Sequence, residues 1–186
     1  MLIDYVKKLE YKSDLERLNA LKNILKSIRN EVSGELKNQK FLSNKKIKFI
    51  EQNYNYLAFK GTNIIVDVGN GKKHIILSAH FDVVSGSPGA NDDASAIAIL
   101  INVIERIKRL KLKNKIRIIF FDDEEIGRFG SISYIKKFGM KDLIAVYHLE
   151  LCGFGDSIGL WPITKKNEDS YALQTIKGVL KEKDIY

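Results

Sequence analysis

The spacing of apolar residues along the chain has a helical period near the N-terminus and a strand-and-helix alternation after residue 60. From Asp14 to Asn30 apolar residues recur every three or four positions, which places their side chains on one face of an α-helix. These positions are Leu15, Leu18, Leu21, Leu25 and Ile28. Ser13 and Glu16 at the start have the form of a capping box. We therefore predict a helix over 14–30, followed by a more polar stretch to about Tyr54.

Downstream of residue 60, short runs of β-branched and aromatic residues alternate with amphipathic segments. The pattern predicts strands at 64–68, 74–79, 115–121, 143–151 and 155–161, and helices at 93–111, 131–138 and 168–180. Gly69-Asn70-Gly71 supplies the positive φ of a tight hairpin between the first two strands. Strands 115–121 and 143–151 are apolar on both faces, which is typical of buried strands. The alternation indicates the α/β class, with helices on both faces of a mostly parallel sheet.

The chain has 186 residues, which matches a typical domain of about 100–200. No internal repeat and no linker rich in Pro, Gly or Ser divides it. We expect a single domain over 1–186, in which 1–54 forms an N-terminal helical segment.

Acidic side chains and one histidine follow the predicted strands. They are His80 and Asp82, Glu124 and Glu125, and Glu150, with Asp92 just before a predicted helix. Ligands of an open α/β sheet bind beyond the carboxyl ends of its strands, so these side chains should share one edge. Carboxylates gathered there repel one another unless a cation lies among them. Carboxylates together with an imidazole suit Zn²⁺, Mn²⁺ or Co²⁺.

The spacing within these motifs suggests different roles. His80 and Asp82 lie at i and i+2 on one strand face, so Asp82 can orient the imidazole for a metal. Glu124 and Glu125 are adjacent and point apart, so that one can bind a metal while the other transfers protons. Asp92 at the mouth of a helix can bridge two ions.

Each motif taken singly also has a structural explanation. A His-x-Asp sequence can be a hydrogen-bonded strand end, Asp92-Asp93 can cap a helix, and Glu124-Glu125 can form a solvated turn. Glu150 is harder to explain in this way, because an unpaired carboxylate in a buried strand is costly.

The ordered set of motifs resembles the zinc aminopeptidase family of the bacterial leucyl aminopeptidases, which is related to glutamate carboxypeptidase and the glutaminyl cyclases. The motifs are Ser78-Ala79-His80-Phe81-Asp82, Gly89-Ala90-Asn91-Asp92-Asp93-Ala94-Ser95, and Phe121-Asp122-Asp123-Glu124-Glu125-Ile126-Gly127 with Gly130-Ser131. The resemblance runs from about Asn63 to Gly155. It implies a zinc exopeptidase-like three-layer sandwich with a mostly parallel, mixed central sheet.

The resemblance also implies a metal site with named ligands. His80 and Glu150 would hold one zinc, with Asp92 bridging to a second zinc on Glu125. One or two ions are expected, with Mn or Co as alternatives. A cis peptide bond is implied between Asp92 and Asp93.

The resemblance further implies an activity. Glu124 would be the general base, and Asp82 would support His80 as its hydrogen-bond partner. Metal-activated water would then hydrolyse the N-terminal peptide bond of a peptide with a free N-terminus.

Two departures from the family pattern leave alternatives open. The family places Asp where this chain has Glu150, and its last metal ligand is a His on a later loop. The histidines here are His74, His80 and His148, of which the first and last are expected to be structural. We therefore expect a chain that lacks the last strands of the fold, either a fragment or a protein completed by a partner. The alternatives are an inactive binding or structural remnant, or a single-zinc glutaminyl-cyclase-like transferase.

Composition narrows the expected partners. Lys and Arg number 31 against 23 Asp and Glu, giving a net charge of +8 that permits a nucleic-acid partner. The basic segment 106–117, however, joins a helix end to a strand start and has no interleaved aromatic residue, so nucleic acid is not expected. No apolar run approaches the ~20 residues of a membrane span, and the start lacks a signal pattern. We expect a cytoplasmic protein without a membrane partner, leave a homo-oligomer open, and place the single cysteine, Cys152, in the core.

Overall fold

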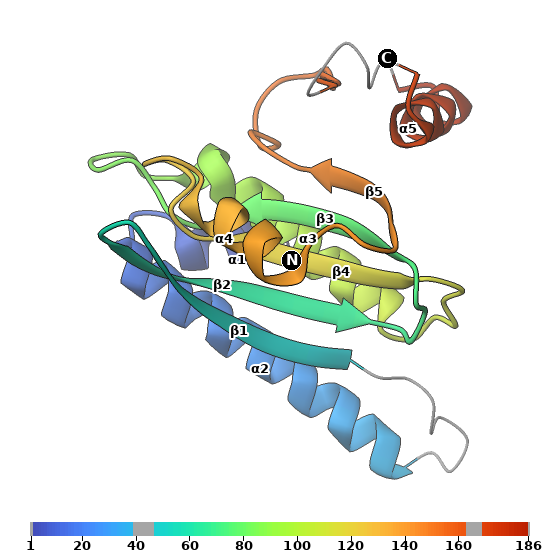
Figure 1. Cartoon of the computed structure of the whole chain (residues 1–186), viewed down its shortest axis with the longest axis horizontal. Helices are drawn as coiled ribbons and strands as arrows, with labels where there is room; N and C mark the ends of the chain where they lie inside the picture. Colours follow the sequence, from blue (N-terminus) through green and yellow to red (C-terminus); the bar gives the residue numbers. More distant parts are fainter. Residues whose placement is uncertain (1, 39–46, 163–168, 186) are drawn as a thin grey trace.

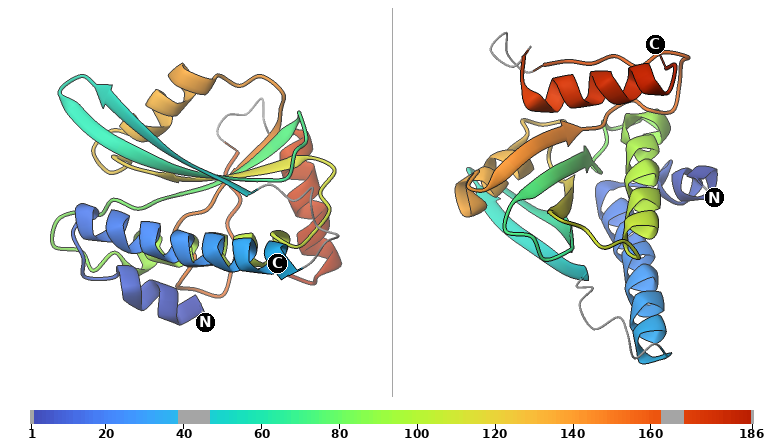
Figure 2. Two further views of the ribbon diagram at one scale, coloured as in Figure 1. Left: turned by 90° about the horizontal axis from the view of Figure 1, so that it is seen from below. Right: turned by 90° about the vertical axis from the view of Figure 1, so that its right-hand side faces the viewer.

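The computed structural model describes residues 2–38, 47–162 and 169–185, and in these ranges a five-stranded mixed sheet lies between helices (Figures 1 and 2). The strands are β1 (Ile47–Tyr56), β2 (Phe59–Val68), β3 (His74–His80), β4 (Lys115–Phe121) and β5 (Leu143–His148). The helices are α1 (Leu2–Leu9), α2 (Asp14–Asn38), α3 (Ser95–Ile107), α4 (Phe129–Phe138) and α5 (Tyr171–Glu182), and a distorted helical turn, η1 (Ala90–Ala94), precedes α3. The expected α/β class with a mixed sheet is confirmed.

The strand order is β1-β2-β4-β3-β5. Strand β2 pairs antiparallel with both β1 and β4, whereas β3 pairs parallel with both β4 and β5. The carboxyl ends of β4, β3 and β5 therefore meet at one edge of the sheet. Strand β4 lies between β2 and β3, which confirms the central strand predicted over 115–121.

The predicted hairpin at Gly69-Asn70-Gly71 is wrong. The chain does reverse direction there, and Gly69 has a φ of 89°. Strands β2 and β3 do not pair, however, because β4 lies between them. A local turn motif predicts that the chain reverses direction, but it does not predict which strand pairs with β2.

The helical segment predicted over 1–54 is wrong at its end, because strand β1 occupies 47–56; residues 39–46 lie outside the described ranges. This strand forms a hairpin with β2, in which Tyr56 pairs with Phe59. Its polar residues concealed it, since Gln52 and Tyr54 are buried while Asn53 between them is exposed. Alternate burial of polar residues gives no apolar pattern to detect.

Several predicted boundaries also differ. Helix α3 covers 95–107 instead of 93–111, and α5 begins at Tyr171, although residues 163–168 lie outside the described ranges. Residues 155–161 form no strand. Strand β5 ends at His148, and within the described part of the chain it is an edge strand with Val146 39% exposed. Cys152 is exposed and is not the core residue that was expected.

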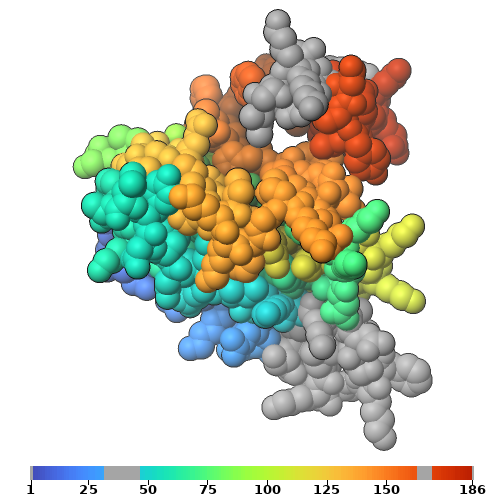
Figure 3. Space-filling model, viewed as in Figure 1, coloured from blue at the N-terminus to red at the C-terminus, as the bar shows by residue number. Residues whose placement is uncertain are grey.

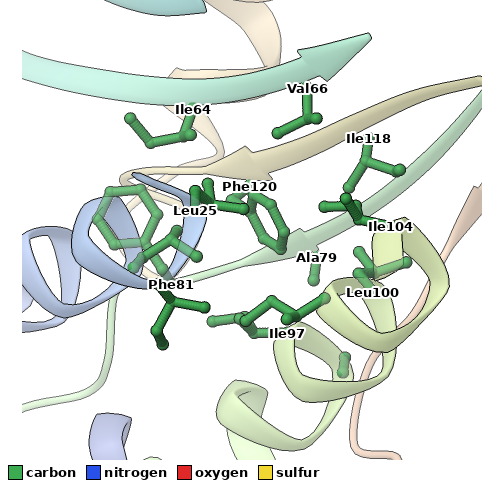
Figure 4. Close-up of a cluster of buried hydrophobic side chains, with 14 of the residues drawn as sticks. Leu25, Ile64, Val66, Ala79, Phe81, Ile97, Leu100, Ile104, Ile118 and Phe120 are labelled. Carbon is green, nitrogen blue, oxygen red and sulfur yellow. The ribbon is translucent and has the colours of Figure 1, made fainter. Parts of the chain in front are cut away.

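The main core lies between one face of the sheet and helices α1, α2 and α3 (Figure 4). Phe120 and Ile118 of β4 are fully buried there against Ile97, Leu100 and Ile104 of α3. Helix α4 covers the opposite face (Figures 2 and 3). There Tyr134 packs in a smaller cluster of buried residues. Helix α5 contacts β5 at the edge of the sheet.

The basic segment 106–117 is engaged in internal contacts. Arg117 donates to both carboxylate oxygens of Asp67 at 2.7 Å, and to the Tyr134 hydroxyl at 3.0 Å. Lys108 is buried and forms an ion pair of 3.0 Å with Glu31 of α2. Arg117 therefore joins β4 to β2 and to α4, and Lys108 joins the end of α3 to α2. None of the described helices is long and apolar enough to cross a membrane.

The central position of β4 makes Phe120 a test of the core. Phe120→Ala should lower the free energy of unfolding by about 3–5 kcal/mol, because it leaves a cavity where the side chain is 0% exposed. Phe154→Ala is the matched control, since Phe154 is 90% exposed and its loss should change stability by less than about 0.5 kcal/mol. Urea denaturation of both variants measures the difference. Equal losses would contradict the placement of β4 at the centre of the sheet.

Candidate metal centre

The candidate site lies at the edge where β3, β4 and β5 end. His80 is the last residue of β3, Glu124 and Glu125 form the turn after β4, and Glu150 follows β5 by two residues. Asp92 lies in η1, just before α3. Four segments that are distant in sequence thus bring their side chains to one end of the sheet, as their positions after the strands predicted.

Three of these side chains form a compact group. His80, Asp92 and Glu150 each offer a ligand atom, and these atoms lie within 4.8 Å of one another, the only such group of three in the described part of the chain. Nε2 of His80 is 2.9 Å from Oδ1 of Asp92. Both atoms are buried and neither has a hydrogen-bond partner. The residues fit a zinc ion, because an imidazole and two carboxylates are typical zinc ligands and two of their atoms are buried without a partner.

The His80 ring is held in the orientation that a metal ligand needs. Its Nδ1 lies 3.2 Å from the carbonyl oxygen of Asp82 and 3.4 Å from the Oδ1 atom of Asp82. A carbonyl can only accept, so Nδ1 carries a proton, and Nε2 is the nitrogen that can bind a metal once it is deprotonated. The other carboxylate oxygen of Asp82 accepts from the Glu125 amide at 2.9 Å. Asp82 therefore joins the end of β3 to the turn after β4.

The turn that carries Asp92 is tied to the segments on either side of it. The peptide bond between Asp92 and Asp93 is cis, as the resemblance implied. The carboxylate of Asp93 accepts from the His80 amide at 3.2 Å. The side chain of Asn91 accepts from the Gly153 amide at 2.8 Å, so it joins this turn to the loop after Glu150. The sequence motif contained Asn91, but nothing in the pattern assigned it a role.

Glu124 and Glu125 lie beside the group of three without joining it. Glu124 forms an ion pair of 3.2 Å with Arg128, which is itself exposed. Glu125 is half-buried, and in the described ranges no third imidazole or carboxylate groups with it and Asp92. Whether Glu125 binds a second ion stays a prediction.

Glu150 reaches the site differently from what the sequence suggested. It is exposed and lies beyond the end of β5, not inside a buried strand. The argument that its burial is costly was therefore wrong, because β5 is an edge strand and the chain leaves the sheet at His148. Nδ1 of His148 lies 3.0 Å from the Ser78 hydroxyl oxygen. His74 is the first residue of β3, at the other end of that strand from His80.

The charges of the site make a cation favourable. Burial raises the pKa of Asp93 to about 8, and the charges of Asp92 and Glu150 add to the increase. Burial also raises the pKa of Glu125, with Asp92 as the next cause. Burial alone would lower the pKa of His80, but its hydrogen bond to Asp82 and the nearby carboxylates outweigh this and raise it to about 9. A bound divalent cation would relieve the repulsion among these carboxylates.

Comparison with known proteins gives a family and several similar proteins. The model of the family described as "Peptidase family M28" matches residues 63–183. Aminopeptidase Y of Saccharomyces cerevisiae is 39% identical over 82 residues, which are 42% of this chain and 15% of that protein. The structure of BSAP, a zinc aminopeptidase from Bacillus subtilis, superposes with a TM-score of 0.61 at 24% identity, over 69% of this chain and 34% of that one.

A glutaminyl cyclase of an Acidobacteriales bacterium also shares the fold. Its TM-score is 0.68 at 15% identity, over 98% of this chain and 66% of the cyclase. This likeness concerns the fold alone. The chain spans a small part of the curated relative and about one third of the matched aminopeptidase structure.

The raised pKa values predict how stability depends on pH without metal. In the presence of a chelator, the free energy of unfolding should fall as the pH rises from about 6.5 to about 9. The pKa of His80 rises from 6.5 to about 9 on folding and that of Asp93 from 3.8 to about 8, so the folded state holds the extra protons. These protons stabilise the folded state, and this stabilisation is lost as the pH rises through the pKa values that the two groups have in the folded state. Urea denaturation at a series of pH values measures the slope.

Two controls accompany this pH series. His80→Gln should flatten the part of the slope that lies between pH 8 and 9, because it removes the group with the higher pKa. Saturating zinc should reverse the slope, because a metal binds deprotonated ligands. Stability that stays constant or rises over this interval without metal would contradict the electrostatic description of the site.

Proposed function

The chain belongs to peptidase family M28, and from this membership and its site we propose that it acts as a zinc-dependent aminopeptidase. The observation that carries the proposal is the convergence of His80, Asp92 and Glu150, with Glu124 beside them on the turn after β4. The names of the matched relatives support hydrolysis at the N-terminus of a peptide. Because the chain spans only part of those relatives, its own activity and substrates are part of the proposal.

We propose that the described residues bind one zinc tightly. His80, Asp92 and Glu150 provide three ligands, the number typical of a catalytic zinc that keeps one position open. Asp92 and Glu125 provide only two for a second ion. When bound, zinc supplies Lewis-acid activation of water and of the scissile carbonyl.

The protein side chains then handle protons and orientation. Glu124 takes the proton of the attacking water and transfers it to the leaving amine, as a general base and then a general acid. Glu124 lies on the turn that the hydrogen bond between the Glu125 amide and Asp82 joins to the end of β3. Asp82 keeps Nδ1 of His80 protonated, so that Nε2 stays available. The substrate is a peptide with a free N-terminus.

Zinc stoichiometry tests the ligand assignment. Calorimetric titration of the wild-type chain should give one tight site. His80→Gln should abolish it, because the variant loses the imidazole ligand, whereas Glu125→Gln should leave it nearly intact. Two sites of equal affinity, or a loss of the tight site in Glu125→Gln, would show that the ligands are wrongly assigned.

The role of Glu124 is tested separately from metal binding. Glu124→Gln should bind zinc with unchanged affinity and lower the hydrolysis of leucine p-nitroanilide about 10²–10⁴-fold, because the amide cannot accept a proton. Glu51→Gln is the control, since Glu51 is exposed on β1 and pairs with Lys22 on α2. Its turnover should equal that of the wild type.

Two other outcomes would favour different functions. A wild-type chain that binds zinc without any turnover would favour an inactive binding remnant of the fold. Cyclisation of a peptide with an N-terminal glutamine, without hydrolysis, would favour a glutaminyl-cyclase-like transferase.

A further inference from the structure

A fully buried arginine lies behind the candidate metal centre. Arg17 of α2 is 0% exposed, and its guanidinium donates to three backbone carbonyls. Nε donates to the carbonyl oxygen of Leu9 at 3.1 Å, Nη1 to that of Asp82 at 3.4 Å and Nη2 to that of Gly89 at 2.6 Å. One side chain thus connects the end of α1 to the segment after His80 and to the turn before Asp92.

The partners of Arg17 are unusual for a buried cation. All three acceptors are neutral carbonyls. Burial lowers the pKa of Arg17, and the charges of Asp14, Asp93, Asp82 and Asp92 oppose that decrease. A buried cation without a carboxylate in direct contact is costly, which distinguishes Arg17 from Arg117, whose guanidinium pairs with Asp67.

Gly89 is shaped to receive this guanidinium. Its φ is 62°, and a Cβ atom there would lie 2.6 Å from Nη1 and 2.8 Å from Nη2 of Arg17. Only glycine therefore lets the backbone approach the guanidinium so closely. The contact and the turn that leads into Asp92 depend on one another.

Further contacts join the same two regions. The Val83 amide donates to the Asp14 carboxylate at 3.0 Å, and the Tyr11 amide donates to the Pro88 carbonyl at 2.8 Å. The segment 11–17 thus holds the loop 82–89 at several points along its length. Arg17 is the member of this group that reaches both ends of the loop.

We propose that Arg17 is a positioning residue of the metal centre. By holding the carbonyls of Asp82 and Gly89 at a fixed separation, it keeps His80 and Asp92 facing each other. The inference extends the proposed function, since it relies on these two residues as zinc ligands. It assigns to the N-terminal helices, which lie outside the segment 63–183 matched by the family, a role in setting metal affinity.

The sign of the effect on zinc affinity separates positioning from charge. A cation near the centre repels zinc, so if Arg17 acted only through its charge, removing it would raise the affinity. If it positions the ligands, removing it lowers the affinity. Arg17→Met removes both charge and hydrogen bonds, whereas Arg17→Lys keeps the charge but loses the forked geometry that reaches several carbonyls.

The matched control is Lys108→Met. Lys108 is also a buried cation, and its partner Glu31 lies on the same helix as Arg17. This ion pair joins α2 to the end of α3 and includes no residue of the candidate site. This variant should lower the stability of the packing between helices α2 and α3 without affecting zinc affinity. It shows how much of any effect comes from loosening α2 alone.

Two measurements on the full chain test the proposal. In chelator, hydrogen–deuterium exchange of segment 82–92 should be faster in both Arg17 variants than in the wild type and in Lys108→Met. In competition titrations with a chelator, zinc affinity should fall at least ten-fold in Arg17→Met and Arg17→Lys, and stay unchanged in Lys108→Met. Circular dichroism checks that each variant is folded.

The outcomes are distinguishable. Unchanged exchange of segment 82–92 in folded Arg17 variants would overturn the proposal whether or not the chain binds zinc. Higher zinc affinity in Arg17→Met would also overturn it, since only the charge would matter. If Arg17→Met does not fold, Arg17→Lys decides by the same two criteria. A wild-type chain that does not bind zinc would refute the proposed ligands, while the exchange data would still decide whether Arg17 holds the loop.

Discussion

Repulsion among carboxylates at one edge of the sheet is the constraint around which this site is built. The parallel strands β4, β3 and β5 end together there, and the turns that follow them carry acidic side chains. Burial and mutual repulsion raise the pKa values of Asp93 and Glu125. A fold that gathers such groups is stabilised by a divalent cation at their centre, and the unpartnered atoms of His80 and Asp92 mark where it would lie.

The segments that carry these side chains are held by single side chains that each join two of them. Asp82 connects the end of β3 to the Glu124–Glu125 turn, and Asn91 connects the Asp92 turn to the loop after Glu150. Arg17 connects both ends of the loop between Asp82 and Gly89 to the N-terminal helices. No single element of secondary structure holds the site, so its geometry depends on these cross-connections between loops.

The segment matched by the family and the helices that precede it contribute differently to the site. The segment matched by family M28, residues 63–183, contains every proposed ligand and the proposed base. Helices α1 and α2 precede it, yet they pack in the main core and bring Arg17 to the back of the site. The N-terminal part of the chain therefore both covers one face of the sheet and supports the turn that carries Asp92.

The sequence by itself determined the central strand, the motif order and the convergence of His80, Asp92 and Glu150 at one edge. Strand 115–121 is apolar on both faces and is central, although the same pattern over 143–151 belongs to β5, an edge strand among the described residues, and motifs placed after parallel strands must meet at one edge. The helical period of α2 also places Arg17 on the buried face of the helix, which the positions of the apolar residues alone did not indicate. Arg17 lies four residues before the buried Leu21, whereas Leu15, which the pattern assigned to the buried face, is 67% exposed.

Tertiary structure alone decided the rest. Strand β4 separates β2 from β3 despite the turn signal between them, because neighbours in a sheet are chosen by pairing between distant segments. Strand β1 formed despite its buried polar residues, because pairing with β2 satisfies its backbone. The partners of Arg17 are carbonyl groups, which every residue carries, so no pattern of side chains in the sequence can identify them. Only the folded chain brings these groups within hydrogen-bonding distance.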